Sequence, residues 1–131
     1  MIGLDTNVLI RYLVRDDQHQ YEKATRLLRR AVDAGEPIMV SLLTLLEMEW
    51  VLRSRYALSK EDIAAAISSL LDAAELMFED EPSVEEAMHL WKGSATDFAD
   101  CLINVRYRRL GCRTTATFDR KALRLTGFSQ V

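Results

Sequence analysis

Residues 1–15 read MIGLDTNVLIRYLVR, and the interpretation of the whole chain starts from the order of residue types within them. The apolar run that ends at Asp5 is typical of a short buried strand. From Thr6 onward, apolar residues recur at helical spacing, so a helix is expected to begin directly after the acid. A buried strand followed at once by an amphipathic helix is the repeating unit of α/β proteins.

The remainder of the chain repeats this alternation. Further strands are expected at residues 38–40, 75–78 and 114–118, and longer helices at residues 18–34, 41–56, 59–71, 84–91 and 97–110, with a short basic helix after Asp119. Ser41 and Ser59 are expected to cap the helices that they precede. Short strands separated by helices predict a parallel sheet flanked by helices. Because no repeat, low-complexity stretch or linker interrupts the pattern, we expect one α/β domain over residues 1–131.

The composition is that of a globular protein, with 49% apolar and 28% charged residues. No apolar run approaches the roughly 20 residues that cross a bilayer, and the first residues lack the basic start of a signal peptide. We therefore expect a cytoplasmic protein without a membrane partner. Cys101 and Cys112 fit this location as reduced packing residues.

The net charge of −3, from 17 basic and 20 acidic residues, excludes a generic basic nucleic-acid-binding module. It does not exclude RNA as a substrate, because the local potential depends on where the acids lie. If five carboxylates belonged to a metal site, the other charged residues would sum to about +2, and the bound metal would make the local potential more positive.

Two acids directly follow predicted strands. Asp5 comes after the first strand, and Asp119 comes after the strand at residues 114–118. Ligands of open α/β sheets bind beyond the carboxyl ends of the strands, which favours a functional role for both acids. Each aspartate is also a good N-cap for the helix that follows it, and for either residue alone this is an equally good explanation.

A second group of polar residues lies on the helix expected at residues 97–110. Asp97, Asp100 and Asn104 are spaced to share one helical face, beside apolar residues that pack. Acids in the first turn also stabilise the helix dipole, so the two aspartates have a structural explanation as well.

The helix at residues 41–56 carries two further acids. Glu47 has the apolar residues Leu43 and Trp50 one turn away on either side, so it should be costly to bury without a partner or a metal. Glu49 has a possible counter-ion in Arg53, four residues later. Helical periodicity does not choose between them.

Several acids that converge on one point require a cation. Two carboxylates about 4 Å apart repel by roughly 4 kcal/mol at an effective dielectric constant of 20. Oxygen-only ligands select hard ions such as Mg²⁺, Mn²⁺ or Ca²⁺. With only His19 and His89 in the chain, a histidine-rich zinc centre is not expected.

Taken together, four segments of the chain resemble the PIN-domain ribonucleases, and among them the VapC-like toxins of bacterial type II toxin–antitoxin pairs. The segments are GLDTNVLIRYLVRDD at residues 3–17, LLTLLEMEWVLR at 42–53, TDFADCLI at 96–103 and TATFDRKALR at 115–124. They occur in the family's order, and the likeness covers nearly the whole chain. The resemblance implies a PIN-like three-layer sandwich, with a short, mainly parallel central sheet flanked by helices.

The resemblance also implies roles for particular residues. The family's catalytic acids match Asp5, Glu47, Asp100 and Asp119, so Glu47 is preferred over Glu49. The metal ligands implied are Asp5, Asp97, Asp100 and Asp119. The residues expected to contact substrate or to support the acids are Thr6, Asn7, Thr117, Arg11 and Arg120. The chain departs from the family because no second acid closely follows Asp119, which weighs against a fully occupied two-metal site.

The function implied is the hydrolysis of RNA phosphodiesters by an endoribonuclease that uses Mg²⁺ or Mn²⁺ to activate water. A VapC-like toxin further implies a cognate antitoxin protein as partner, and a homodimer. Trp50 and Phe118 are expected to pack against other side chains and not to stack on bases.

Three alternatives compete with this hypothesis. A haloacid-dehalogenase-like phosphatase needs a second aspartate two residues after the first, where this chain has Asn7. In a receiver domain the acidic pair follows a strand, whereas Asp16 and Asp17 follow a predicted helix. A catalytically silent PIN-like module that only binds RNA or protein is disfavoured because all four matched acids are present.

Overall fold

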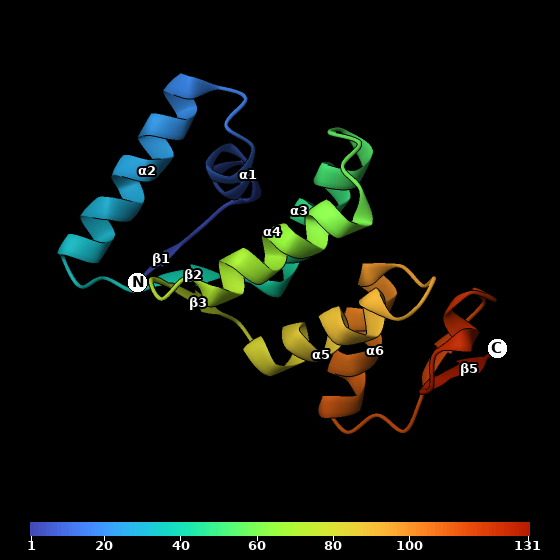
Figure 1. The fold of residues 1–131 in the computed structure, drawn as a ribbon. Helices are drawn as coiled ribbons and strands as arrows, with labels where there is room; N and C mark the ends of the chain where they lie inside the picture. The colour runs from blue at the N-terminus through green and yellow to red at the C-terminus, as the bar shows by residue number, and fades with distance from the viewer. The chain divides into compact units, whose positions relative to one another are not determined.

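The computed structural model describes residues 1–131, and the chain forms two compact units, Met1–Glu79 and Asp80–Val131. Figure 1 follows the chain from the first unit in blue and green to the second in yellow and red. Each unit has its own helices and its own parallel strand pairing.

The first unit alternates three strands with four helices. They are β1 (Ile2–Gly3), α1 (Thr6–Val14), α2 (Gln18–Asp33), β2 (Ile38–Val40), α3 (Leu42–Ser54), α4 (Lys60–Asp72) and β3 (Leu76–Phe78). The strands pair in parallel in the order β1-β2-β3, with Ile38 opposite both Ile2 and Leu76. Right-handed crossovers between sequential neighbours place their helices on the same face of a sheet, and Figure 1 shows α1 to α4 on one side of the three strands.

The core of this unit lies between the sheet and these helices. On β2, Ile38 and Val40 are fully buried, while Met39 points to the opposite face. The helices contribute the fully buried side chains Leu9, Ile10, Leu45, Met48, Leu52, Ile63, Ile67 and Leu70. Each such side chain contributes about 1.5–3 kcal/mol of burial free energy, so the core fixes the positions of the strand ends.

Side-chain caps set where three helices of this unit begin. The Asp17 carboxylate accepts a hydrogen bond from the Gln20 amide at the start of α2. Ser41 and Ser59 accept from amides three residues later, at the starts of α3 and α4. The two serine caps expected from the sequence are therefore confirmed, and they fix the register of the acids on α3.

The second unit contains two helices, a short 3-10 turn and two strands. They are α5 (Glu81–Lys92), α6 (Phe98–Arg109), β4 (Thr115–Thr117), η1 (Ala122–Arg124) and β5 (Phe128–Gln130). The two strands pair in parallel, with Thr115 opposite Phe128. The helices pack against each other, and the rings of Trp91 and Phe98 lie 5.2 Å apart. An ion pair of 3.0 Å between Asp80 and Arg106 joins the start of α5 to α6.

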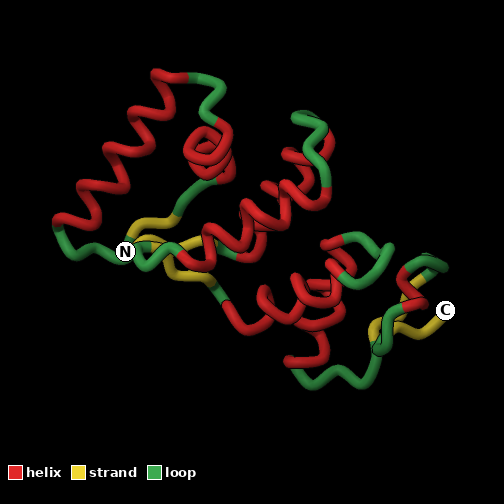
Figure 2. The backbone as a smooth tube through the Cα atoms, in the orientation of Figure 1, coloured by secondary structure: helices red, strands yellow, loops and turns green.

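The expected α/β architecture with short parallel strands and flanking helices is confirmed, but two details at the C-terminal end were predicted wrongly. The strand at residues 115–117 is not the last one, because β5 follows and pairs with it (Figure 2). The basic helix expected after Asp119 is only the 3-10 turn η1. β5 has three residues and follows Gly127 at φ +107°, so it carries no alternating pattern long enough to predict it. A single domain over residues 1–131 stays a prediction.

None of the helices combines the length and the apolar content that crossing a membrane requires.

Candidate active site

Asp5 leaves the end of β1 with an unengaged carboxylate. It occupies the N-cap position of α1 and its backbone carbonyl accepts from the amide of Val8, yet its side chain makes no capping hydrogen bond. The side chain is exposed, whereas the neighbouring Thr6 is 3% exposed. Capping by the side chain therefore does not explain Asp5, and its carboxylate is free to bind a ligand.

The first turn of α3 lies beside Asp5. The Thr44 hydroxyl, positioned by the Ser41 cap, donates to the carbonyl of Leu4 at 3.3 Å. Leu4 immediately precedes Asp5, and Glu47 follows Thr44 by three residues, on the same helical face. The core packing of β1 and α3 therefore brings both acids to the same end of the first unit.

The structure separates the two glutamates of α3. Glu47 is exposed, together with Leu43 and Trp50, which are 79% and 50% exposed. The expected cost of burying Glu47 therefore does not arise, because Glu47 is exposed, although Val51 one turn after it is buried. Glu49 is the buried acid, at 3% exposure, and its carboxylate accepts from Arg53 Nε at 2.9 Å.

Three aspartates gather in the second unit. Asp97 is the N-cap of α6 without a side-chain capping bond, and Asp100 lies in the first turn of that helix. Burial raises the pKa of the Asp100 carboxyl above its ordinary value, and the negative charges of Asp119 and Asp97 raise it further. None of the three forms an ion pair with a basic residue. The end of β4 and the start of α6 thus present mutually repelling carboxylates.

The loop that holds Asp119 is tied to both elements. The Thr117 hydroxyl accepts from the Asp119 amide at 3.0 Å, and the Asp119 carboxylate accepts from the Lys121 amide at 2.8 Å. The hydroxyl of buried Thr96, just before α6, donates to the carbonyl of Lys121. This bond lies before η1, whose N-cap is Lys121, so Asp119 is not the helix cap that the structural explanation expected. The other carboxylate oxygen of Asp119 has no such bond.

Asn104 has a structural part in this unit. It is 5% exposed, its amide group donates to the Thr126 carbonyl at 2.8 Å, and its amide oxygen accepts from the Thr115 hydroxyl at 3.4 Å. A Cβ atom at Gly127 would lie 2.6 Å from the same oxygen. Asn104 shares a helical face with Asp100, but its amide is used to hold β4 and β5 against α6.

The residues expected to contact substrate differ in whether their side chains already have hydrogen-bond partners. Arg11 is engaged, since its Nη1 donates to both oxygens of Asp16 at 2.9 Å and to the Tyr56 hydroxyl. Only its Nη2 donors have no partner. Asn7 and Arg120 are exposed and make no side-chain hydrogen bond. The network around Arg11 was not foreseen, because Tyr56 lies 45 residues away.

Two aromatic side chains beside the acids are exposed. Trp50 is 50% exposed one turn after Glu47, and Phe118 is 83% exposed directly before Asp119. The expectation that the ring packs against other side chains is wrong for Phe118, whereas half of the Trp50 surface is covered. Exposed aromatic rings are the usual stacking surface for unpaired bases.

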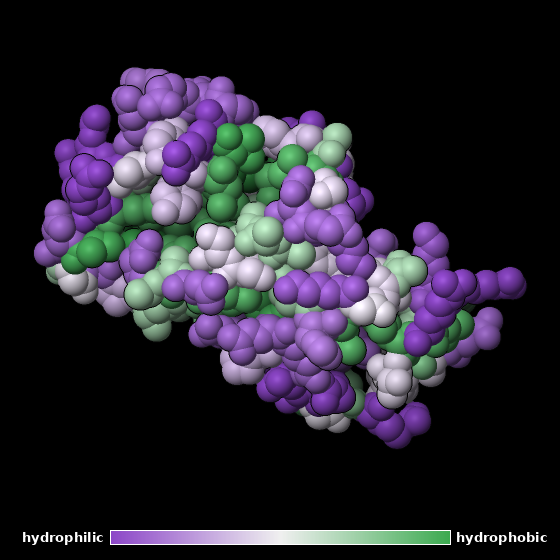
Figure 3. Space-filling view, in the orientation of Figure 1, coloured by the Kyte–Doolittle hydropathy of each residue, from purple (hydrophilic) through white to green (hydrophobic).

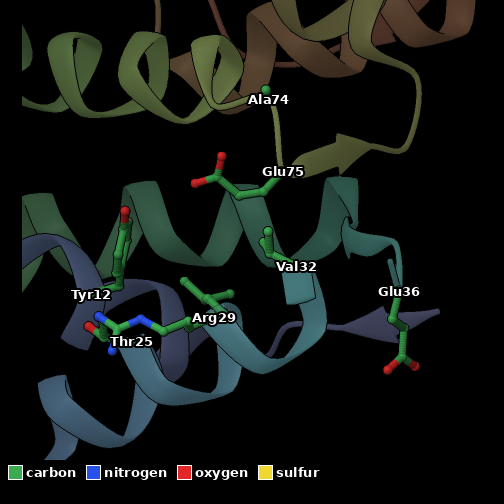
Figure 4. A pocket seen from close by; sticks show the side chains of 8 residues that line it. Tyr12, Thr25, Arg29, Val32, Glu36, Ala74 and Glu75 are labelled. Atoms are coloured by element: carbon green, nitrogen blue, oxygen red, sulfur yellow. The ribbon is translucent and has the colours of Figure 1, made fainter. Parts of the chain in front are cut away.

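Two cavities lie in the first unit, and none of the expected acids lines either of them. The larger is a mostly apolar cavity of 620 Å³ with the lining Tyr12, Thr25, Leu28, Arg29, Val32, Glu36, Ala74 and Glu75 (Figure 4). In the space-filling view, hydrophobic side chains are visible at the surface between α2 and α4, and hydrophilic side chains lie along α2 (Figure 3). The smaller cavity lies between α1 and α2 and has a volume of 390 Å³.

The donor chemistry fits a hard cation, although neither unit by itself brings three ligating side chains close enough to hold one. Asp5 and Asp97 are unengaged, and the pKa of Asp100 is raised by burial and, after that, by the charges of Asp119 and Asp97. Carboxylate oxygens of this kind are the ligands that Mg²⁺ and Mn²⁺ prefer.

Comparison with known proteins adds a sequence relationship. The chain is 27% identical over 128 residues to a VapC ribonuclease of Aquifex aeolicus. The alignment covers 98% of this chain and 93% of the relative. A crystal structure of the Mycobacterium tuberculosis toxin VapC20, which cleaves the sarcin-ricin loop, matches 95% of this chain and 94% of that chain, at 19% identity and a TM-score of 0.43. That superposition is too loose to bear on the site. The family model of the PIN domain matches residues 2–128, and the chain therefore belongs to the PIN domain family.

Proposed function

We propose that this PIN-domain protein is a metal-dependent endoribonuclease that hydrolyses RNA phosphodiesters, and that it is the toxin of a toxin–antitoxin pair. The observation that carries the proposal is the group of carboxylates around Asp100, which repel one another and have no basic partner. Such a group is expensive to maintain unless it binds a cation. The relationship to a VapC ribonuclease over nearly the whole chain supports the same activity.

The metal site is proposed to use Asp5, Asp97, Asp100 and Asp119, with Mg²⁺ or Mn²⁺ as the ion. A bound ion of this kind supplies a water of lowered pKa and neutralises charge on the phosphate. The pairing of Asp119 with the Lys121 amide holds one of its oxygens and leaves the other for the ion. Thr117 is proposed to support Asp119 through the hydrogen bond that its hydroxyl accepts from the Asp119 amide. Thr6, which is buried beside Asp5, is proposed to support that acid.

Glu47 is proposed to take the proton from the attacking water. It is exposed and makes no hydrogen bond, so its carboxylate is free to accept a proton. The substrate phosphate is proposed to meet Arg120, Asn7 and the free donors of Arg11. Trp50 and Phe118 offer stacking surfaces for unpaired bases beside the acids, which suits a single-stranded or looped RNA.

The biological setting is part of the same proposal. A VapC-like toxin acts on cellular RNA in the cytoplasm and is neutralised by a cognate antitoxin protein. A homodimer is part of the same expectation for such a toxin.

The test is cleavage of total cellular RNA by the full chain in Mg²⁺ or Mn²⁺, with EDTA as the metal-free condition. Asp5→Asn and Asp100→Asn are expected to reduce cleavage at least about 100-fold. Asp72→Asn removes one exposed carboxylate at the end of α4 and serves as the matched control, with unchanged cleavage. Cleavage that persists in EDTA and in both site variants would contradict the proposal. A folded protein that cleaves no RNA would favour the silent binding module.

A further inference from the structure

The smaller cavity of the first unit is an open groove between α1 and α2. Its lining residues are Asn7, Val8, Arg11, His19, Gln20, Lys23, Ala24 and Leu27. The lining contains three basic side chains and no acidic one. One lining residue, Asn7, stands two positions after Asp5 in the first turn of α1, which puts this part of the groove close in the chain to the first acid of the proposed site.

Lys23 supplies the uncompensated charge of this groove. Its ammonium group is exposed and makes no hydrogen bond or ion pair. Arg11 also lines the groove, but the Asp16 carboxylate lies 2.9 Å from it and offsets its charge. His19 stands one helical turn before Lys23 on α2, so its ring and the ammonium group share one face of the groove.

The floor of the groove is apolar. Val8 and Ala24 are half-buried and buried, and Leu27 is 37% exposed at the mouth. A cationic rim over an apolar floor matches the two halves of a nucleotide, a charged phosphate and a flat ring system. The volume of 390 Å³ lies near the lower end of the about 300–1,000 Å³ range of small-ligand sites, which suits one nucleotide of a strand and not a duplex.

We propose that this groove holds the backbone of a single-stranded RNA next to the cleavage site, with Lys23 on a phosphate and Leu27 against the sugar and base. The inference rests on the proposed ribonuclease function and adds to it a place where the strand leaves the catalytic acids. A phosphate contact positions the strand without reading its sequence. The groove therefore sets affinity and register, while sequence preference arises elsewhere.

The test measures binding of a fluorescein-labelled, ten-nucleotide RNA of mixed sequence by fluorescence anisotropy over a range of salt concentrations. All proteins carry Asp5→Asn so that the probe stays intact. Lys23→Gln is compared with Arg26→Gln, which removes the same charge from an exposed position of α2 outside the groove. Both side chains are exposed and unpaired, so neither substitution should change the midpoint of urea unfolding measurably.

Lys23→Gln is expected to raise the dissociation constant roughly 3- to 10-fold at low salt and to make the salt slope shallower by about 0.7, the value for one phosphate on a single strand. Arg26→Gln is expected to change affinity less than about 2-fold, and Lys23→Arg to restore the wild-type slope.

Two results would overturn the inference. Equal losses in Lys23→Gln and Arg26→Gln would show only a diffuse charge effect, and unchanged binding in Lys23→Gln would mean that the groove serves another partner, such as a protein segment. The wild-type cleavage assay separates this failure from a wider one. If the wild type cleaves RNA while Lys23→Gln binds normally, only the groove is wrong. If the wild type neither cleaves nor binds RNA, the ribonuclease proposal falls with it.

Discussion

The two glutamates of α3 provide a matched pair of perturbations with opposite consequences. Glu49 is 3% exposed and receives a charge-assisted hydrogen bond of 2.9 Å from Arg53, whose own side chain is half exposed. A hydrogen bond to a charged group contributes about 1.5–3 kcal/mol when buried, and exposure of the arginine reduces this through solvent screening. Glu49→Gln is therefore expected to lower the unfolding free energy by about 1–2 kcal/mol.

Glu47 should behave in the reverse way. Its carboxylate is exposed and unpaired, so Glu47→Gln is expected to change stability by less than about 0.5 kcal/mol. The same substitution removes the proposed proton acceptor and is expected to slow RNA cleavage by about 100-fold or more. Both substitutions replace a glutamate with glutamine on the same helix, two positions apart, and both remove one negative charge. Each variant is therefore a control for the other.

Urea unfolding and RNA cleavage measured on the same preparations separate these outcomes. Glu49→Gln should unfold at lower urea and retain most of its activity, because its carboxylate lies on the core side of α3. Glu47→Gln should unfold like the wild type and be almost inactive. The reverse pattern, in which Glu49→Gln is stable and inactive, would refute the assignment of Glu47 as the functional acid of this helix.

Three further predictions concern the second unit. In EDTA, the wild type should lose stability as the pH rises from 3.8, the ordinary pKa of an aspartate, through the raised pKa of Asp100, because the folded state holds the proton of this carboxyl more tightly than the unfolded state does. Asp100→Asn should remove this loss in thermal melts. A hydrogen bond from Ser83, together with the charge of Arg106, lowers the pKa of Asp80. The stability that the ionised Asp80 contributes above pH 3.8 should therefore be lost as the pH falls through this lowered pKa, and in Asp80→Asn the melting temperature should depend less on pH in the acidic range. Gly127→Ala should destabilise by about 2 kcal/mol or more in urea, since its Cβ would meet Asn104 and its φ is +107°. Additive losses in the double variant with Asn104→Ala would show that the two residues do not clash.

The sequence-based analysis failed at α3 for a physical reason. This helix carries apolar residues on nearly every side, including the exposed Leu43 and the buried Leu45. Periodicity identifies which residues share a face, but not which face meets the sheet when both are apolar. Only the packing of α3 against α1 and α4 shows that Glu49 is buried and Glu47 is exposed.

The acids of the second unit were easier to predict. The spacing of Asp97 and Asp100 follows from helical geometry alone, and Asp119 follows a β-branched strand. Their mutual repulsion depends on the loop from Thr117 to Lys121, which folds back toward α6 through Thr96. A contact between residues 25 positions apart leaves no local signal in the sequence. The same is true of Asn104, whose burial depends on the unpredicted β5.

Direct Mn²⁺ binding tests the central proposal, that Asp5, Asp97, Asp100 and Asp119 are metal ligands. Free Mn²⁺ is titrated by electron paramagnetic resonance with the wild type, Asp5→Asn from the first unit, Asp119→Asn from the second, and Asp72→Asn as the surface control. If these acids are the ligands, the wild type and Asp72→Asn should bind Mn²⁺ with the same affinity. Asp5→Asn and Asp119→Asn should each weaken that binding by at least about 10-fold. Full-affinity Mn²⁺ binding in either of these two variants would contradict the proposed ligand set.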